Sequence, residues 1–220
     1  MINVAPHPLL RVHVFETVFP QPMEFCEIPA HIQASISGGQ AGQVPGTPLF
    51  SIDDDHRKYI RDMLRAGGFK PSGRSKPACE YLERAVADGI LASINLAVDM
   101  CNVVSLFSGF PISVVDADLT CGELSIRQAT SGESYVFNSV GQTIELSGLV
   151  CLYDQMGACA NAVKDCQRTK TNSGTLRTIS VIWSAHALEE KSRQAADWYA
   201  SMLADLGCEL NWIEVTYNNP

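Results

Sequence analysis

The stretch 95–116, NLAVDMCNVVSLFSGFPISVVD, decides the fold class of this chain. Its first part places apolar residues on nearly every side of a helix, which is typical of a helix buried inside a protein. We expect this helix over Ile94–Ser108, because Gly109 and Pro111 would end it. β-Branched residues follow at once and predict a strand over Ile112–Val115.

Helical patterns dominate before this stretch, and strand patterns dominate after it. We expect Ser51 to cap a helix that stops before Gly67, and Ser75 to cap another that holds Pro77 in its first turn and runs to Val86. Loops are predicted over 37–48 and 69–76. The further predictions are strands over Leu10–Phe19, Leu124–Ala129, Ser134–Phe137, Leu149–Tyr153, Thr178–Trp183 and Cys208–Val215, and a helix over Leu188–Leu206. Helices followed by a run of strands predict an α+β fold.

The composition predicts one folded domain over residues 1–220. The chain is 46% hydrophobic and 18% charged, and it shows neither a repeat nor a long linker. No apolar run approaches the ~20 residues that span a bilayer, so we expect no membrane contact. The segment Met1–Phe19 lacks the features of a signal peptide, which places the expected location in the cytoplasm.

The cysteine and histidine patterns predict neither a metal site nor a cofactor. The eight cysteines are scattered without any Cys-x-x-Cys pair, and we expect reduced, mostly buried thiols. Cys166 lies beside Asp165 and Arg168, charged neighbours that would influence a reactive thiol. Because no histidine lies near Cys166 in the sequence, we do not expect a cysteine nucleophile.

The charge is unevenly distributed along the chain. The net charge is −8, yet residues 57–84 hold eight basic and three acidic side chains and carry +5. Such a strip suits a phosphate backbone, whereas a solvated helix face followed by a basic loop would show the same pattern. The residues of this strip that we predict to contact tRNA are Arg57, Lys58, Arg61, Arg65, Lys70, Arg74 and Lys76.

Three polar residues interrupt the buried helix. Asn95, Asp99 and Asn102 are four and three positions apart, so they share one helical face. Asp99 would either accept backbone N–H bonds and fix the following loop, which we favour, or line a pocket. For Asn102 we favour a place in a polar pocket.

These residues carry a family resemblance. Asn-x-x-Val-Asp-x-x-Asn over 95–102, Gly-x-Pro over 109–111 and an aspartate five positions later resemble the signature of the editing domain of the phenylalanyl-tRNA synthetase β subunit. The segment 165–175, DCQRTKTNSGT, resembles that family's Gly-Gly-Glu-x-Ser-x-Val segment. The resemblance covers about residues 70–185. It implies a strand-rich, sandwich-like core flanked by helices.

The resemblance also implies a reaction and a set of site residues. The family hydrolyses the ester between a wrong amino acid and the terminal ribose of tRNA. The family positions imply Asn102 and Gln167 as catalytic residues, Cys101 and Ser113 as substrate-binding residues, and Asn95, Asp99, Pro111 and Asp116 as the structural motif. Three positions depart from the family, which has Thr at 101, His at 113 and Glu at 167. Ser113 is no base at neutral pH, and Gln167 carries no negative charge.

New polar residues follow Gln167. Arg168, Thr169 and Lys170 are assigned to substrate binding, with Arg168 clamping a phosphate or carboxylate. Arg168 and Lys170 would point the same way if this segment were extended. A solvated basic loop is the alternative.

Three functions therefore remain open. The first is a tRNA-binding, editing-type protein that hydrolyses mischarged aminoacyl-tRNA in trans, with the aminoacylated 3′ end, and possibly a synthetase, as its partner. The second is a non-catalytic module that binds an amino acid or a small carboxylate. The third is a small-molecule hydrolase on the same scaffold. The sequence does not determine the oligomeric state.

Overall fold

A four-stranded antiparallel sheet forms the middle of the molecule. The computed structural model describes residues 1–38 and 44–218, without the side chain of Arg74. The sheet has the strand order β10 (Glu209–Trp212), β2 (Leu10–Val18), β9 (Arg177–Ala185) and β3 (Ile112–Asp116). Strands β2 and β9 pair along nine residues, so this central sheet joins the two ends of the sequence.

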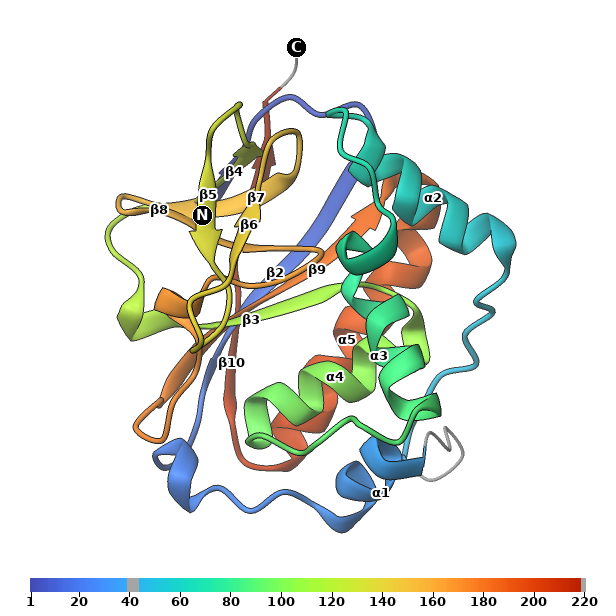
Figure 1. The fold of residues 1–220 in the computed structure, drawn as a ribbon. Coiled ribbons are helices and arrows are strands. Elements are labelled where there is room, and N and C mark those ends of the chain that lie inside the picture. Colours follow the sequence, from blue (N-terminus) through green and yellow to red (C-terminus); the bar gives the residue numbers. More distant parts are fainter. Residues whose placement is uncertain (39–43, 219–220) are drawn as a thin grey trace.

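A second sheet, here called the outer sheet, packs against one face of the central sheet (Figure 1). Its order is β11 (Val215–Tyr217), β1 (Ile2–Val4), β4 (Ser125–Gln128), β7 (Val150–Asp154) and β8 (Gly157–Asn161). A separate hairpin consists of β5 (Ser134–Val136) and β6 (Thr143–Glu145). The core between the sheets includes Val12, Val181 and Trp183 of the central sheet and Ile126 and Leu152 of the outer sheet.

Helices cover the opposite face of the central sheet. Helices α4 (Leu96–Ser108) and α5 (Glu189–Asp205) lie on the sheet, while α1 (Ala30–Gly38) and α3 (Ala78–Ala87) pack on α4. Side chains that alternate along the strands, such as Phe15, Ile112 and Ile182, enter this second core. Helix α2 (Asp54–Arg65) contributes Ile60 to it and Met63 to the core between the sheets. The fold is α+β, a two-sheet sandwich flanked by helices.

Helix α4 carries the polar residues predicted to share one face. Asn95 is its N-cap and accepts a hydrogen bond of 3.0 Å from the Val98 backbone. Asp99 is fully buried and accepts hydrogen bonds from the Ile94 backbone, at 2.9 Å, and from the Ser93 hydroxyl. Asp99 therefore fixes the turn before the helix and not the loop after it, because its side chain points toward the helix N-terminus.

Local contacts shift several predicted boundaries. Asp53, and not Ser51, caps α2, because its carboxylate accepts from the His56 backbone. Ser75 caps no helix: it ends a 3₁₀ turn, Gly73–Ser75, and α3 begins after Pro77. The sequence did not predict α1, β1, β6 and β8, and the C-terminal strand divides into β10 and β11. Of the loop predicted over 37–48, residues 37 and 38 belong to α1, and 39–43 lie outside the described residues.

The thiols and the helix lengths agree with the sequence analysis. All eight cysteines are free, and six of them are buried as predicted, whereas Cys26 is half-buried and Cys121 is exposed. Among the described residues, no helix is long and apolar enough to cross a membrane.

Candidate functional site

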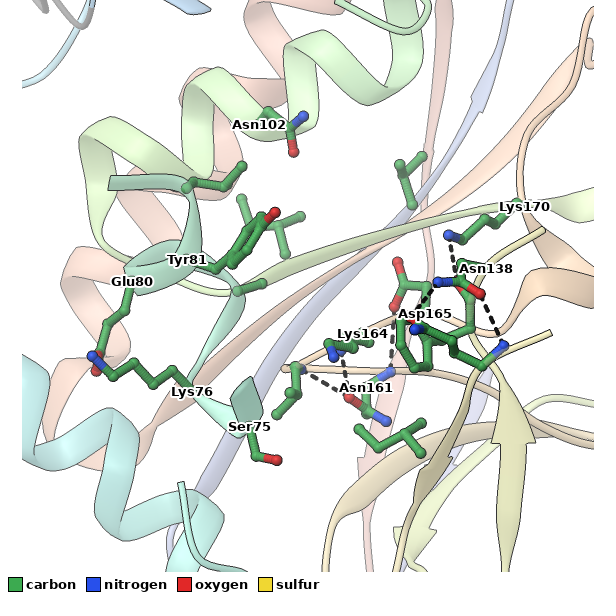
Figure 2. A pocket seen from close by; sticks show the side chains of 18 of the residues that line it. Ser75, Lys76, Glu80, Tyr81, Asn102, Asn138, Asn161, Lys164, Asp165 and Lys170 are labelled. Atoms are coloured by element: carbon green, nitrogen blue, oxygen red, sulfur yellow. Dashed lines mark hydrogen bonds between the residues drawn. The ribbon is translucent and has the colours of Figure 1, made fainter. Parts of the chain in front are cut away.

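A groove of about 1900 Å³ opens between the helical layer and the β5–β6 hairpin. One wall comes from α3 and α4, and the opposite wall comes from the hairpin and the chain that follows β8. Strand β3 adds Ile112 and Val114 to the lining. Figure 2 shows Tyr81 and Asn102 on the helical side, with Asp165 across the groove from them. The groove thus has a largely apolar wall facing a polar one.

Asp165 stands at the centre of the polar wall in a chain of hydrogen bonds. The Ser113 hydroxyl donates to Asp165 Oδ1 at 2.7 Å, and the Asn161 backbone N–H reaches the same oxygen at 3.3 Å. Trp183 Nε1 donates to Ser113 Oγ at 2.9 Å. Ser113 Oγ also lies 3.2 Å from the Asn161 carbonyl oxygen, the longer of its two acceptor contacts. Ser113 and Trp183 are buried, so this chain connects the core between the sheets to the groove.

The surroundings of Asp165 raise the pKa of its carboxyl group toward neutral pH. Burial raises the pKa of Asp165 to about 7, although the hydrogen bonds from Ser113 and Asn161 and the charge of Lys170 oppose this rise. A carboxyl group with this pKa exists in both protonation states at neutral pH. Asp165 therefore has the acid–base property that Ser113 lacks.

The turn that holds Asp165 is fixed by Asn161. Asn161 Oδ1 accepts hydrogen bonds from the backbone of Val163, at 2.8 Å, and of Lys164, at 3.0 Å. Its Nδ2 donates to the Tyr135 hydroxyl at 2.6 Å, and that hydroxyl donates to the Lys164 carbonyl. The hairpin and the turn after β8 are thereby held as one unit, which positions the Asp165 carboxylate.

The helical wall presents Asn102 and Cys101 differently. Asn102 is half-buried and directs its amide into the groove (Figure 2). Cys101 also lines the groove, but its thiol is buried and lies 3.6 Å from the Ile112 carbonyl. Burial raises the pKa of Cys101 well above its ordinary value. Asn102 thus offers a polar group to a ligand in the groove, whereas Cys101 contributes only its buried side chain to this wall.

The segment after Asp165 forms a 3₁₀ turn, Gln167–Thr169, and not the extended strand that would align Arg168 with Lys170. Arg168 makes two hydrogen bonds of 2.8 Å to Asp154, and Thr169 donates to the Cys159 carbonyl at 3.1 Å. Within the described chain, neither residue lines the groove, nor does Gln167. The carboxylate clamp assigned to Arg168 therefore has no place in the groove.

Lys170 has the opposite orientation. Its Nζ lies in the groove and donates to the Phe137 carbonyl at 2.7 Å. Of the three residues assigned to substrate binding after Gln167, the structure brings only Lys170 to the groove that Asn102 lines, as far as the described residues show.

Comparison with known protein families matches residues 70–196, more than half of the chain, to the family described as the B3/4 domain. This chain belongs to the B3/4 domain family. The match covers α3, α4, most of the groove, strands β3 and β9 of the central sheet and strands β4, β7 and β8 of the outer sheet, and it confirms the resemblance inferred from the two motifs.

Two relatives extend this result. The β subunit of phenylalanine–tRNA ligase from Bartonella quintana (strain Toulouse) is 32% identical over 118 residues, which cover 52% of this chain and 15% of the relative. The chain thus spans a small part of that subunit. The crystal structure of an N-terminal fragment of the phenylalanyl-tRNA synthetase β subunit from Pyrococcus horikoshii superposes with a TM-score of 0.53 at 11% identity. The superposed region covers 99% of this chain and 52% of the fragment, and the superposition confirms the fold.

In this B3/4 domain the two sequence motifs meet in space. Asn95 Nδ2 donates to Thr171 Oγ1 at 3.1 Å, which joins the start of α4 to the second motif. Asp116 accepts from Thr175 Oγ1 at 2.6 Å and from Asn172 Nδ2 at 3.1 Å. Pro111 continues this frame, because its carbonyl accepts from the Trp183 backbone at 3.0 Å. Asn95 and Asp116 thus join the two motifs, and Pro111 joins the first motif to β9.

The basic strip of the B3/4 domain divides into two parts. On α2 its members form ion pairs: Arg57–Glu83, Arg61–Glu80, Lys58–Asp62 and Arg65–Asp62. Lys70 and Lys76 instead line the groove, at the same end as α3. The side chain of Arg74 lies outside the described residues. Cations that already form ion pairs are less available to phosphates, and among the described residues no ion pair holds Lys70 or Lys76.

Sequence reasoning missed Asp165 and Asn161 as site residues. Asp165 opens the second motif, but the resemblance assigned it no role, and Asn161 lies outside both motifs. The role of both residues depends on contacts with Ser113 and Tyr135, which are distant in sequence. Among the described residues, no group of three His, Cys, Asp or Glu side chains is arranged to hold a metal ion.

Proposed function

We propose that this B3/4 domain binds the aminoacylated 3′ end of tRNA in its groove and hydrolyses the ester of a wrong amino acid in trans. The observation that carries this proposal is the groove itself, which places the Asn102 amide opposite Asp165 and adds Lys170. An ester substrate needs groups that bind its carbonyl and activate water, and these residue types supply both.

The groove offers distinct places for the parts of such a substrate. The apolar wall includes Tyr81 and Ile94, which are 61% and 67% exposed and would cover the amino-acid side chain. Lys70 and Lys76 lie where phosphates of the tRNA end would enter. The matched relative is a subunit of phenylalanine–tRNA ligase, a name that refers to an amino acid and a tRNA. This relationship supports tRNA as the ligand here.

The net charge of −8 limits the strength of this binding. Repulsion from the acidic surface opposes the attraction of the groove lysines, so we expect weak binding that falls steeply with salt. A synthetase bound to the same tRNA is the proposed partner that would bring the substrate near, and the cytoplasm is the proposed location.

The decisive test is the deacylation of mischarged tRNAs by the purified chain. A panel of tRNAs carrying different wrong amino acids is incubated at low salt, and ester loss is compared with the spontaneous rate. We expect hydrolysis of one or a few pairs, and Asn102→Ala should lower it by about 10–100-fold. The absence of hydrolysis across the panel at high protein concentration would refute the proposal.

A non-catalytic binding module is the second candidate. The observation that favours it is the replacement of a histidine by Ser113, whose hydroxyl is occupied within the core and does not line the groove. Lys170 would then hold the carboxylate of a free amino acid. Calorimetric titration with single amino acids distinguishes the two, because a binding module would retain a free amino acid and leave aminoacyl-tRNA intact.

A further inference from the structure

We propose that Asp165 is the catalytic base of this hydrolysis and that Ser113 and Trp183 are the residues that position it. The inference rests on the proposed function, and it names a residue to which the family resemblance assigns no role. It explains how a domain with serine at the histidine position retains a group able to take a proton.

The geometry orients the Asp165 carboxylate at the wall of the groove. The hydrogen bonds from Ser113 and Asn161 both end on Oδ1, and the Val114 backbone N–H is a further donor to this carboxylate. Asp165 lines the groove, and Figure 2 shows its carboxylate on the side that faces Tyr81 and Asn102. A base needs a fixed orientation and access to water, and half-buried Asp165 has that access from the groove.

The donors and acceptors also define the direction of the hydrogen-bond series from Trp183 through Ser113 to Asp165. Trp183 Nε1 is a donor only, so Ser113 Oγ must accept from it and donate its own proton onward. The shorter onward contact is to Asp165, at 2.7 Å. Trp183 and Ser113 thus fix the carboxylate from the buried core, much as an orienting residue fixes a catalytic histidine.

The reaction then balances with water as the sole co-reactant. The Asp165 carboxylate takes a proton from a water molecule while the water oxygen bonds to the ester carbonyl carbon. The bond between that carbon and the ribose oxygen breaks, and the ribose oxygen leaves with the proton held by Asp165. The products are the free amino acid, whose carboxyl group releases its proton to solvent, and tRNA with a free ribose hydroxyl.

Several charged or titratable groups surround Asp165 and set its protonation. Lys170 attracts the carboxylate, and Lys164, in the adjacent position, holds its ammonium 4.1 Å from the Phe137 ring centre. Tyr135, Cys101 and Cys151 stay neutral at pH 7, because burial raises the pKa of each. Desolvation of Asp165 therefore outweighs the attraction of Lys170, which accords with its pKa of about 7.

The first test compares Asp165→Asn with wild type on the tRNA that wild type hydrolyses fastest. We expect kcat/KM to fall by about 100-fold or more, since asparagine cannot accept the proton. The wild-type rate should fall below pH 7 as Asp165 becomes protonated. This acid limb of the pH–rate profile should be absent in the variant. The matched control is Asp118→Asn, an exposed aspartate paired with Arg177 outside the groove, which should keep the wild-type rate and profile.

The second test observes the hydrogen-bond chain without substrate. The indole N–H resonance of Trp183 should shift with an apparent pKa near 7 in wild type and should not titrate in Asp165→Asn. Ser113→Ala should remove the shift of the indole and move the acid limb of the rate to higher pH, and Ser113→Thr should restore both. The same spectra show whether each variant is folded.

The outcomes separate the two proposals. A wild-type chain that hydrolyses mischarged tRNA while folded Asp165→Asn keeps its rate and its acid limb would overturn the role of Asp165 and leave the proposed function standing. A Trp183 resonance that titrates in wild type, in a chain that hydrolyses no tRNA, would instead refute the proposed function and show that the hydrogen-bond chain alone is present.

Discussion

Arg168 holds the buried carboxylate of Asp154 with two hydrogen bonds of 2.8 Å, one from each terminal nitrogen. The Asp154 side chain is inaccessible to solvent, whereas Arg168 is one-third exposed. Asp154 also accepts from the backbone of Cys121 and Met156. The pair therefore fixes the end of β7 and joins it to the turn after Asp165, which gives Arg168 a structural role.

The first prediction concerns this pair. Arg168→Ala should lower the free energy of unfolding by about 2–3 kcal/mol, because it leaves a buried carboxylate without its partner. Deacylation by the folded variant should change by less than about threefold. Chemical denaturation measures the loss, and Arg65→Ala, which breaks an exposed pair on α2, should cost below about 1 kcal/mol. If the Arg168→Ala protein were as stable as wild type but inactive, the structural role would be contradicted and Arg168 would have to contact the substrate.

The second prediction concerns the start of α4. Asn95→Ala should cost about 1–2 kcal/mol, because it removes both the N-cap of the helix and the bond to Thr171. Asn95→Asp keeps the oxygen that caps Val98 and loses the donor to Thr171, so it should recover most of the loss. Thermal unfolding of both variants measures the difference. Equal destabilisation would mean that the Thr171 contact, and not the cap, is the larger contribution.

The third prediction separates the two parts of the basic strip. Lys70→Ala with Lys76→Ala should weaken tRNA binding and reduce the slope of log affinity against log salt by up to about 2. Lys58→Ala, on α2 and paired with Asp62, should leave that slope unchanged. Binding is measured by fluorescence anisotropy at several salt concentrations. The reverse order of effects would place the tRNA on α2 instead of at the groove.

The fourth prediction follows from a buried histidine. His56 contacts the Gly109 carbonyl at 3.1 Å, and burial lowers the pKa of His56 below its ordinary value of 6.5. The unfolded chain therefore binds more protons in the window below pH 6.5, so the stability that His56 contributes is present above 6.5 and is lost as the pH falls. Burial shifts the pKa of His7 and His13 in the same direction. Urea midpoints should decrease from pH 7 to pH 5, and His56→Gln should make that decrease smaller.

The fifth prediction concerns Asp165, whose contribution to stability changes with pH in the opposite direction to that of His56. Because the pKa of Asp165 is raised to about 7 in the fold, the native state binds the extra proton between about pH 4 and pH 7. The stability linked to this proton is present below the unfolded pKa and is lost as the pH rises through 7. Asp165→Asn should therefore raise the free energy of unfolding at pH 8 by roughly 1–2 kcal/mol, a value reduced for partial exposure. Unfolding curves at pH 5 and pH 8 check this, and a variant destabilised at pH 8 would contradict it.

The sequence was sufficient for the elements whose patterns are local. The apolar run of α4, its stop at Gly109 and the existence of strands β2 and β9 follow from local residue patterns, whereas the pairing of these two strands does not. The motif around Asn95 and Asp116 was enough to place the chain in its family. Short elements such as β1 and β8 escaped prediction, because three to five residues stand out little and depend on their neighbours in the sheet.

The site needed the tertiary structure. Asn102 could be assigned to a pocket because a polar residue on a buried helix must face something polar. Arg168 and Lys170 are two positions apart, yet a 3₁₀ turn directs one to Asp154 and the other into the groove. Asp165 gains its raised pKa from burial, and it is oriented by Ser113, 52 positions earlier, which in turn accepts from Trp183. Spacing along the chain determined the elements and the family, whereas desolvation and hydrogen bonds between distant strands decided which side chains can do chemistry.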